Sequence, residues 1–246
     1  MMLKTAYLFG IRYSVGNMGE ACREVLRSVR DLKGRYICFS NVHTLVTAVE
    51  NEKYRKILNR SAYTFPDGAP VAWKLRMDGN VTAERIAGPD FMDAMFDVTS
   101  DGSVSHFFYG SSPETLERLA GRIKARYPQI KIAGKYAPPF RKLSAKEDED
   151  ITALINGSDA DIVWVGLGAP KQEVFMHSHR NKIKSLMIGV GAGFDFHAET
   201  AKRAPLWMQK LYLEWLYRLC TEPKRLAGRY FKTNTKFILY CLTKRG

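Results

Sequence analysis

The chain has 246 residues, 46% of them hydrophobic, which is enough for one sizeable core or two closely packed halves. Its four cysteines are scattered without a CxxC pair, which excludes a disulfide-framed module and a zinc-finger site and predicts reduced thiols in a cytosol. The net charge is +13, and residues 199–246 carry eleven Lys or Arg against three Glu. Such a basic excess indicates an anionic partner: nucleic acid, phospholipid or a diphosphate.

The first hundred residues give the weaker secondary-structure signals. The apolar run at 5–11 is shorter than a signal peptide requires, and no stretch reaches the ~18 apolar residues of a membrane span. We therefore expect neither a signal peptide nor a transmembrane helix. An amphipathic helix is predicted over 20–33, a strand over 36–39 and a second helix over 45–58.

From residue 104 onward, strand and helix signals alternate. Strands are predicted over 104–109, 130–134, 161–166 and 185–190, and helices over 113–127 and 171–182. This alternation predicts an α/β fold with a Rossmann-like parallel sheet flanked by helices.

The last fifth of the chain has a different character. Apolar residues recur there at helical spacing, namely Leu206, Trp207, Leu211, Trp215 and Leu219. We therefore expect an α/β core over 1–198 and a basic, amphipathic helical tail over 199–246. The tail suits an anionic membrane interface, and packing on the core or on another subunit would explain its apolar stripe equally well.

A glycine-rich turn separates the strand at 161–166 from the helix that follows. Gly166 and Gly168 let a ligand approach the backbone, and Lys171, Gln172 and Glu173 open the helix at the carboxyl edge of the sheet. The N–H groups at a helix start favour phosphate. The alternative is a tight turn that needs glycine for its geometry.

A second glycine turn follows the strand at 185–190. Gly191 permits close approach to the backbone, and Asp195 lies between two phenylalanines. Asp195 is either a ligand-binding residue or a helix cap or turn residue. Gly191 and Asp195 are therefore candidate substrate-binding residues.

Three polar residues in the first hundred are further candidates. Asp67, in a Pro-Asp-Gly turn, is either a structural turn residue or the general base that an inverting sugar transfer requires. Arg85 could bind a phosphate or form a surface ion pair. Asn41 follows a strand and could bind a sugar or cap the next helix.

The sequence contains no convincing metal-binding pattern. His177 and His179 are two residues apart on a predicted helix and do not share a face. Asp148 and Asp150 lie in an acidic run typical of a solvated helix start. We therefore predict metal-independent chemistry without a cofactor, in which Arg and backbone N–H groups neutralise a leaving diphosphate.

Together these segments resemble the WecG/TagA/CpsF glycosyltransferases, also called glycosyltransferase family 26. The resemblance covers residues 41–237 and rests on eight segments in the family's order: NVHT (41–44), PDGAPVAW (66–73), RIAGPD (85–90), FFYGSSPE (107–114), YAPPFR (136–141), VGLGAPKQE (165–173), GVGAGFDF (189–196) and RAPLWMQKLYLEWLYRLCTEPKRLAGRY (203–230). The wording of the first, second and fifth segments is most similar to the exopolysaccharide branch.

The resemblance implies an inverting transfer of N-acetylmannosamine or a related hexose from a UDP-sugar to a sugar on undecaprenyl diphosphate. The products are teichoic acid linkage units, common antigen or exopolysaccharide. Asp67 matches the family's proposed base, and Arg85, Gln172 and Asn41 match substrate-binding positions. Basic tail positions that reach the lipid diphosphate are matched by Arg218 and Arg225, and Arg229 is a further candidate.

The reduced thiols and the basic amphipathic tail predict a cytoplasmic protein that is peripherally attached to the inner face of the plasma membrane. Packing of the tail on another subunit would make it a homo-oligomer, and we expect no nucleic-acid partner. Two positions depart from the family's pattern: Phe39 stands where members often have Thr, and Gly228 where some have Arg. Similarity to the exopolysaccharide branch leaves UDP-glucose or UDP-glucuronate as the alternative donor to a UDP-linked N-acetylmannosamine.

Two other classes are compatible with parts of the sequence. The glycine turns are found in NAD-type oxidoreductases, but no full G-x-G-x-x-G with a ribose-binding acid is present. The net charge of +13 is compatible with a basic nucleic-acid-binding protein, but no recognition motif accompanies it.

Overall fold

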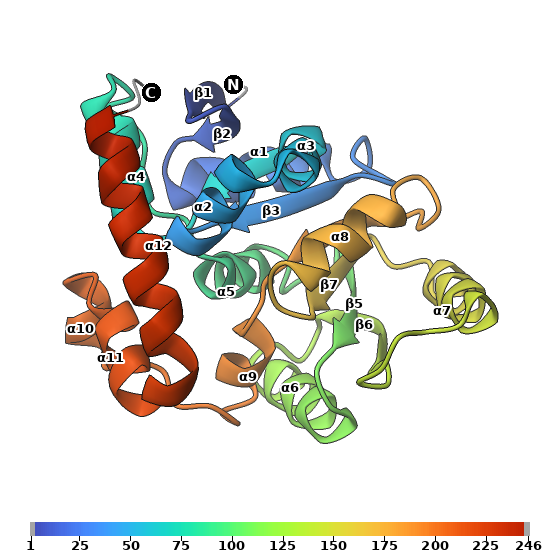
Figure 1. The fold of residues 1–246 in the computed structure, drawn as a ribbon. Coiled ribbons are helices and arrows are strands. Elements are labelled where there is room, and N and C mark those ends of the chain that lie inside the picture. The colour runs from blue at the N-terminus through green and yellow to red at the C-terminus, as the bar shows by residue number, and fades with distance from the viewer. Residues whose placement is uncertain (1–2, 244–246) are drawn as a thin grey trace.

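A six-stranded parallel sheet forms the centre of the computed structural model, which describes residues 3–243. Figure 1 shows helices on both sides of it. The strand order is β4-β3-β8-β7-β5-β6. The strands are β3 (Tyr36–Ser40), β4 (Tyr63–Pro66), β5 (Ser105–Gly110), β6 (Lys131–Tyr136), β7 (Ile162–Gly166) and β8 (Leu186–Gly189). The predicted α/β fold with a parallel sheet is confirmed.

Successive side chains of each strand point to opposite faces of the sheet, so a separate hydrophobic core forms on each face. In β7, Val163 and Val165 point to one core and Trp164 to the other. A sheet covered on both sides therefore has strands that are apolar at every position. This is why the central strands read as continuous apolar runs.

Different helices cover the two faces. One core receives residues of α2 (Val42–Glu50), α3 (Glu52–Arg60), α4 (Ala69–Met77), α7 (Ala145–Gly157) and α8 (Lys171–Ser178). The other receives residues of α1 (Met18–Ser28), α5 (Gly88–Val98), α6 (Pro113–Arg126) and α9 (Gly193–His197). The neighbouring strands β7 and β8 therefore lead to helices on opposite faces, α8 and α9, which leaves a crevice at their carboxyl ends.

The structure differs from the predicted elements in several places. The sequence did not predict strand β4 or helix α5. The apolar run near the N-terminus is a hairpin of β1 (Lys4–Leu8) and β2 (Ile11–Val15), which the sequence did not predict. The predicted helix over 45–58 is two helices, because Asn51 ends α2 and its side chain caps α3. The predicted helices over 20–33 and 171–182 end earlier, at Ser28 and Ser178.

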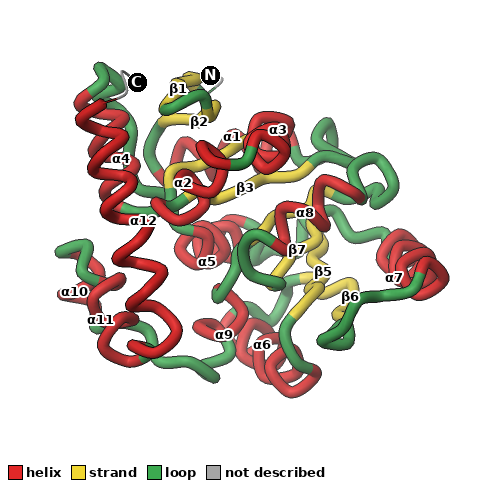
Figure 2. Tube along the Cα trace, viewed as in Figure 1, coloured by secondary structure: helices red, strands yellow, loops and turns green. Residues whose placement is uncertain are grey.

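The basic tail is helical, and it divides into α10 (Leu206–Lys210), α11 (Glu214–Thr221) and the long α12 (Pro223–Thr243). Figure 2 shows these three helices joined by short loops at one side of the sheet. Helix α12 packs along α2, and Lys236 forms an ion pair with Glu50. The division at residue 198 stays a prediction, although the tail helices lie against the core. Within residues 3–243, no helix combines the length and the apolar character needed to cross a membrane.

Candidate active site

A cavity of about 1410 Å³ opens at the carboxyl ends of β3, β4, β5, β7 and β8. All parallel strands end at the same edge, so their polar loops meet there. Residues of α11 and α12, among them Trp215, Asn234 and Ile238, form the opposite wall. The cavity therefore lies between the sheet edge and the basic tail.

Most residues selected from the sequence line this one cavity. They are Asn41, Asp67, Arg85, Gly166, Gly168, Lys171, Gln172, Gly191, Asp195 and Arg218. Glu173 does not line it, because its side chain is fully buried behind Gln172. The side chains of Arg225 and Arg229 lie outside the part of the chain that the structure describes, although both residues are on α12.

Asp67 is held at the end of β4 by its backbone. Its N–H donates to the carbonyl of Ser40 on the neighbouring strand at 3.0 Å. The next residue, Gly68, has a φ of +118°, in a region that favours glycine, and it begins α4. The Pro-Asp-Gly sequence thus ends the strand and leaves the carboxyl group in the cavity wall.

The pKa of Asp67 is raised from 3.8 to about 6, mainly because the carboxyl group is removed from water. Arg85 and Arg218 oppose this rise in pKa, while Glu214 and Asp90 add to it. A carboxyl group with a pKa of about 6 is ionised at neutral pH and is a stronger base than an ordinary aspartate. This combination suits general-base chemistry.

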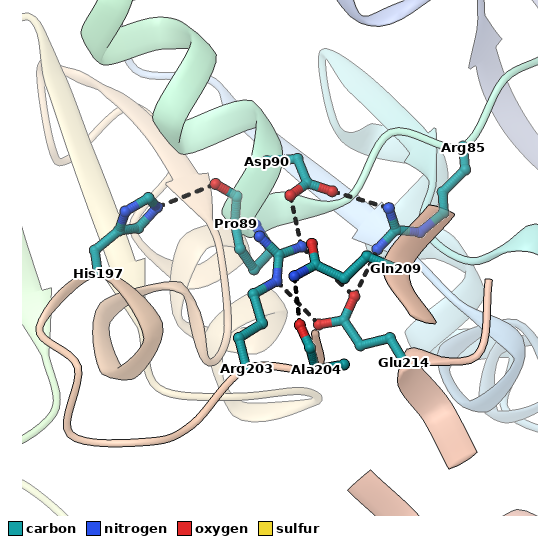
Figure 3. A network of polar contacts seen from close by, with 8 residues as sticks. All are labelled: Arg85, Pro89, Asp90, His197, Arg203, Ala204, Gln209 and Glu214. Atoms are coloured by element: carbon teal, nitrogen blue, oxygen red, sulfur yellow. Dashed lines mark hydrogen bonds and ion pairs between the residues drawn. The ribbon is translucent and has the colours of Figure 1, made fainter. Parts of the chain in front are cut away.

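Arg85 belongs to a closed ring of two arginines and two acids (Figure 3). Its two terminal nitrogens contact Asp90 at 2.8 Å and Glu214 at 3.0 Å. Arg203 contacts the same two acids at 2.5 and 3.2 Å. The ring joins the loop before α5 to the tail, because Arg203 and Glu214 lie beyond residue 198. The ion pairing that the sequence offered as an alternative for Arg85 is thus the arrangement in this structure.

Gln172 lies between the two glycine turns and is 4% exposed. Its Oε1 accepts a hydrogen bond from the N–H of Gly191 at 3.0 Å, and its Nε2 donates to Oε1 of Glu173 at 2.9 Å. The N–H of Gly191 is therefore engaged within the protein. The predicted direct role of Glu173 in donor binding does not fit its placement behind Gln172.

Asp195 lies in the first turn of α9, and Ser111, which follows β5, donates to its Oδ1 at 3.4 Å. Burial raises the pKa of Asp195. Lys171 is the exposed first residue of α8, and Gly168 before it has a φ of +74°. This end of the cavity thus has hydrogen-bonding groups, a cation and a helix N-terminus.

Arg218 projects from α11 toward the same space. Its guanidinium group lies 5.9 Å from the ring centroid of Phe196. Its positive charge opposes the rise in the pKa that burial causes at both Asp67 and Asp195. It is one of the residues through which the tail contributes charge to the cavity.

Asn41 both caps a helix and lines the cavity. Its Oδ1 accepts from the N–H of Thr44 at 3.2 Å at the start of α2. Ser40 is fully buried and bonds to Tyr13 and Thr44, so its hydroxyl is used inside the protein. Phe39 presents an apolar wall to the cavity next to Asn41.

Comparisons with known proteins place these features in a family. Residues 6–246 match the model described as "Glycosyl transferase WecG/TagA/CpsF family". The chain belongs to the WecG/TagA/CpsF family. This confirms the resemblance seen in the sequence and makes the protein a member of a glycosyltransferase family.

Two curated relatives carry the same name, "N-acetylglucosaminyldiphosphoundecaprenol N-acetyl-beta-D-mannosaminyltransferase". The relative from Bacillus subtilis is 32% identical over 228 residues, which are 91% of this chain and 86% of the relative. The relative from Bacillus spizizenii is 32% identical over 194 residues, which are 78% of this chain and 74% of the relative. Both alignments cover most of the two proteins compared.

The sequence of this WecG/TagA/CpsF protein did not reveal two residues of its site. Glu214 was missed because it is an acid in a basic tail, and only its position on α11 brings it to Arg85. Its opposite charge to its neighbours was the one available signal. Ser111 was missed because a Gly-Ser-Ser-Pro turn is explained by helix capping alone, which Ser112 performs here.

The described side chains do not form a preassembled metal site. Within residues 3–243, no group of three or more His, Cys, Asp or Glu gathers in a way that could hold an ion. Asp148, which the sequence assigned to a solvated helix start, lies in the first turn of α7 and contacts His179 at 3.1 Å. The metal-independent chemistry stays a prediction.

Proposed function

We propose that this protein is an inverting glycosyltransferase that moves N-acetylmannosamine or a related hexose from a UDP-sugar to a sugar on undecaprenyl diphosphate. The observation that carries this proposal is Asp67, an aspartate whose pKa is raised to about 6, in a cavity that also holds the glycine turn before α8. The names of the two Bacillus relatives support the acceptor and the sugar.

In the proposed reaction, the carboxylate of Asp67 takes the proton of an acceptor hydroxyl. The acceptor oxygen forms a bond to the anomeric carbon on the face opposite the diphosphate. The bond from that carbon to the diphosphate oxygen breaks, and UDP leaves with the electron pair. One displacement of this kind inverts the anomeric centre, so an α-linked donor gives a β-linked product.

The glycine turn and the start of α8 would receive the diphosphate of the donor. Lys171 supplies a cation there, and the N-terminus of a helix favours phosphate. Asn41, Gln172 and Asp195 add hydrogen-bonding groups along the same wall. Arg85 and Arg218 carry positive charge near Asp67 and limit the rise in its pKa, which favours the ionised carboxylate that acts as the base.

The tail would hold the protein on an anionic membrane surface. Its helices expose large apolar side chains, among them Leu206 at 73%, Trp207 at 59% and Leu211 at 61%. The same segment has a net charge of +8. Apolar and basic side chains together give reversible binding to an anionic bilayer, which is where a lipid-linked acceptor resides. Arg218 would then be available to the lipid diphosphate, and the same role stays a prediction for Arg225 and Arg229, whose side chains lie outside the described structure.

A transfer assay tests the function. The protein is incubated with a short-chain prenyl-diphosphate N-acetylglucosamine and, in turn, UDP-N-acetylmannosamine, UDP-glucose and UDP-glucuronate. We expect release of UDP with one donor, and a β-linked disaccharide by NMR. Release with UDP-glucose or UDP-glucuronate alone would assign the alternative donor. No transfer with any of them, by protein shown to be folded, would contradict the proposal.

Flotation with liposomes tests the membrane contact. A double variant, Trp207→Ser with Leu211→Ser, is expected to lose binding to vesicles of phosphatidylglycerol and phosphatidylethanolamine. The matched control is Tyr7→Ser, an exposed aromatic residue on the N-terminal hairpin that is 60% exposed. Equal binding by the double variant and the wild type would contradict the proposed surface.

A further inference from the structure

The residue behind Gln172 is an acid with no path to the cavity. Glu173 has 0% exposure, and burial raises its pKa. Its Oε1 accepts from Gln172, but its Oε2 has no hydrogen-bond partner among the described residues. A buried carboxyl group is costly unless it is bonded, so its presence calls for a physical reason.

A second buried polar atom is next to it. The hydroxyl of Tyr54 on α3 is also without a partner among the described residues, and Tyr54 is 4% exposed. The two groups are close enough for each to shift the pKa of the other. The hydroxyl of Tyr54 lowers the pKa of Glu173, as a donor to the carboxylate does, so Oε1 remains an acceptor for Gln172.

The consequence falls on the side-chain amide of Gln172. An amide can turn by 180° and exchange its oxygen and nitrogen, at little cost when nothing distinguishes them. Here the N–H of Gly191 requires the oxygen on one side, and the acceptor on Glu173 requires the nitrogen on the other. Gly189 leaves the space that this amide occupies, since a Cβ at that position would lie 3.1 Å from Nε2.

We propose that Glu173 is a positioning residue that fixes the amide of Gln172 so that its second Nε2 hydrogen is presented to the donor diphosphate in the cavity. That hydrogen has no acceptor among the described residues, and Gln172 lines the cavity. Glu173 also secures the loop after β8, because Gln172 holds the N–H of Gly191. The inference rests on the proposed donor class, a nucleoside diphosphate sugar.

Isothermal titration calorimetry of the full chain with UDP tests the inference. Glu173→Met keeps the volume and removes the acceptor, and we expect its dissociation constant for UDP to rise about tenfold, as is typical when a supporting hydrogen bond behind a ligand-binding residue is lost. Glu173→Gln retains a carbonyl acceptor and is expected to bind UDP within about twofold of wild type. The matched control is Glu24→Met, a buried acid that is 6% exposed and lies on α1, which covers the opposite face of the sheet. It is expected to lower the melting temperature without weakening UDP binding.

A double-mutant cycle separates positioning from general support of the fold. If Glu173 acts through Gln172, Glu173→Met has no further effect on UDP affinity in a Gln172→Ala background. Tyr54→Phe provides a milder second probe if Glu173→Met does not fold, with an expected loss of about two- to threefold that also disappears in that background.

Three results would overturn the inference, and they are distinguishable. Unchanged UDP affinity in Glu173→Met, or in Tyr54→Phe when the former does not fold, refutes positioning while the proposed function stands. A loss that remains in full in the Gln172→Ala background assigns Glu173 to the fold alone. A wild-type chain that does not bind UDP removes the proposed donor class and the inference with it.

Discussion

Replacement of Asp67 by Asn should slow transfer by orders of magnitude and at the same time stabilise the fold at neutral pH. The pKa of this carboxyl group is about 6 in the folded protein against 3.8 for an ordinary aspartate. The folded state therefore binds a proton more tightly than the unfolded state, and ionisation of Asp67 destabilises the folded state. Asparagine does not ionise, so the variant escapes this cost.

The magnitude follows from the two pKa values. Each pKa unit corresponds to about 1.4 kcal/mol, which gives an upper bound of about 3 kcal/mol at pH 7. Asp67 lies in the wall of the cavity and keeps some contact with solvent, so we expect a gain of about 1–2 kcal/mol. The sign is fixed: the cost is fully present above pH 6, about half as large at pH 5, and absent below pH 3.8.

Urea unfolding of wild type and Asp67→Asn at pH 7 and pH 5 measures this difference. Asp90→Asn is the matched control, because Asp90 is paired with Arg85 and Arg203. Its loss leaves the two arginines with one acid, so it should destabilise the protein. A raised pKa at this carboxyl group would be refuted if Asp67→Asn were no more stable than wild type at pH 7 and the difference in free energy of unfolding between them were the same at pH 5.

Three further outcomes are expected. The pKa of buried His106 is lowered to about 4, so protonation of this residue should lower the free energy of unfolding by up to about 3 kcal/mol from pH 6.5 to pH 4. An equal fall in the His106→Gln variant would contradict this. Phe9 packs on Phe237 of α12, with 6.4 Å between ring centroids, so Phe9→Ala should speed amide hydrogen exchange in this helix. Unchanged exchange would show that the hairpin does not stabilise α12. Gly68→Ala places a Cβ on a residue with a φ of +118°, so it should lower the free energy of unfolding by about 1–3 kcal/mol and slow turnover by displacing Asp67. Wild-type values for both stability and turnover would refute strain at this turn.

The sheet was predictable because its strands are apolar at consecutive positions. Strands such as β7 and β8 are buried on both faces, and each is followed by glycine or a polar turn. The N-terminal hairpin was not predictable, because its turn consists of Phe9 and Gly10, both with positive φ. Phenylalanine is rare at such a position, so local turn chemistry gave no signal. Its packing against α12 explains why it is there.

The candidate site was partly predictable for a similar reason. Residues at the ends of parallel strands must meet at one edge, and Asn41, Asp67 and Gln172 do so. The pairing of Arg85 with Glu214 depends on how the tail folds back across 129 residues of sequence, which no local pattern encodes. The placement of Glu173 behind Gln172 depends on the rotation of α8, since neighbouring helical residues point about 100° apart.

One measurement tests the proposed chemistry most directly: a single-turnover assay of Asp67→Asn with saturating donor and acceptor, combined with its affinity for UDP. The mechanism predicts that UDP binds as in wild type and that the transfer rate falls by about 10²–10⁴-fold, the usual contribution of a general base. Transfer at the wild-type rate in this variant would contradict Asp67 as the base.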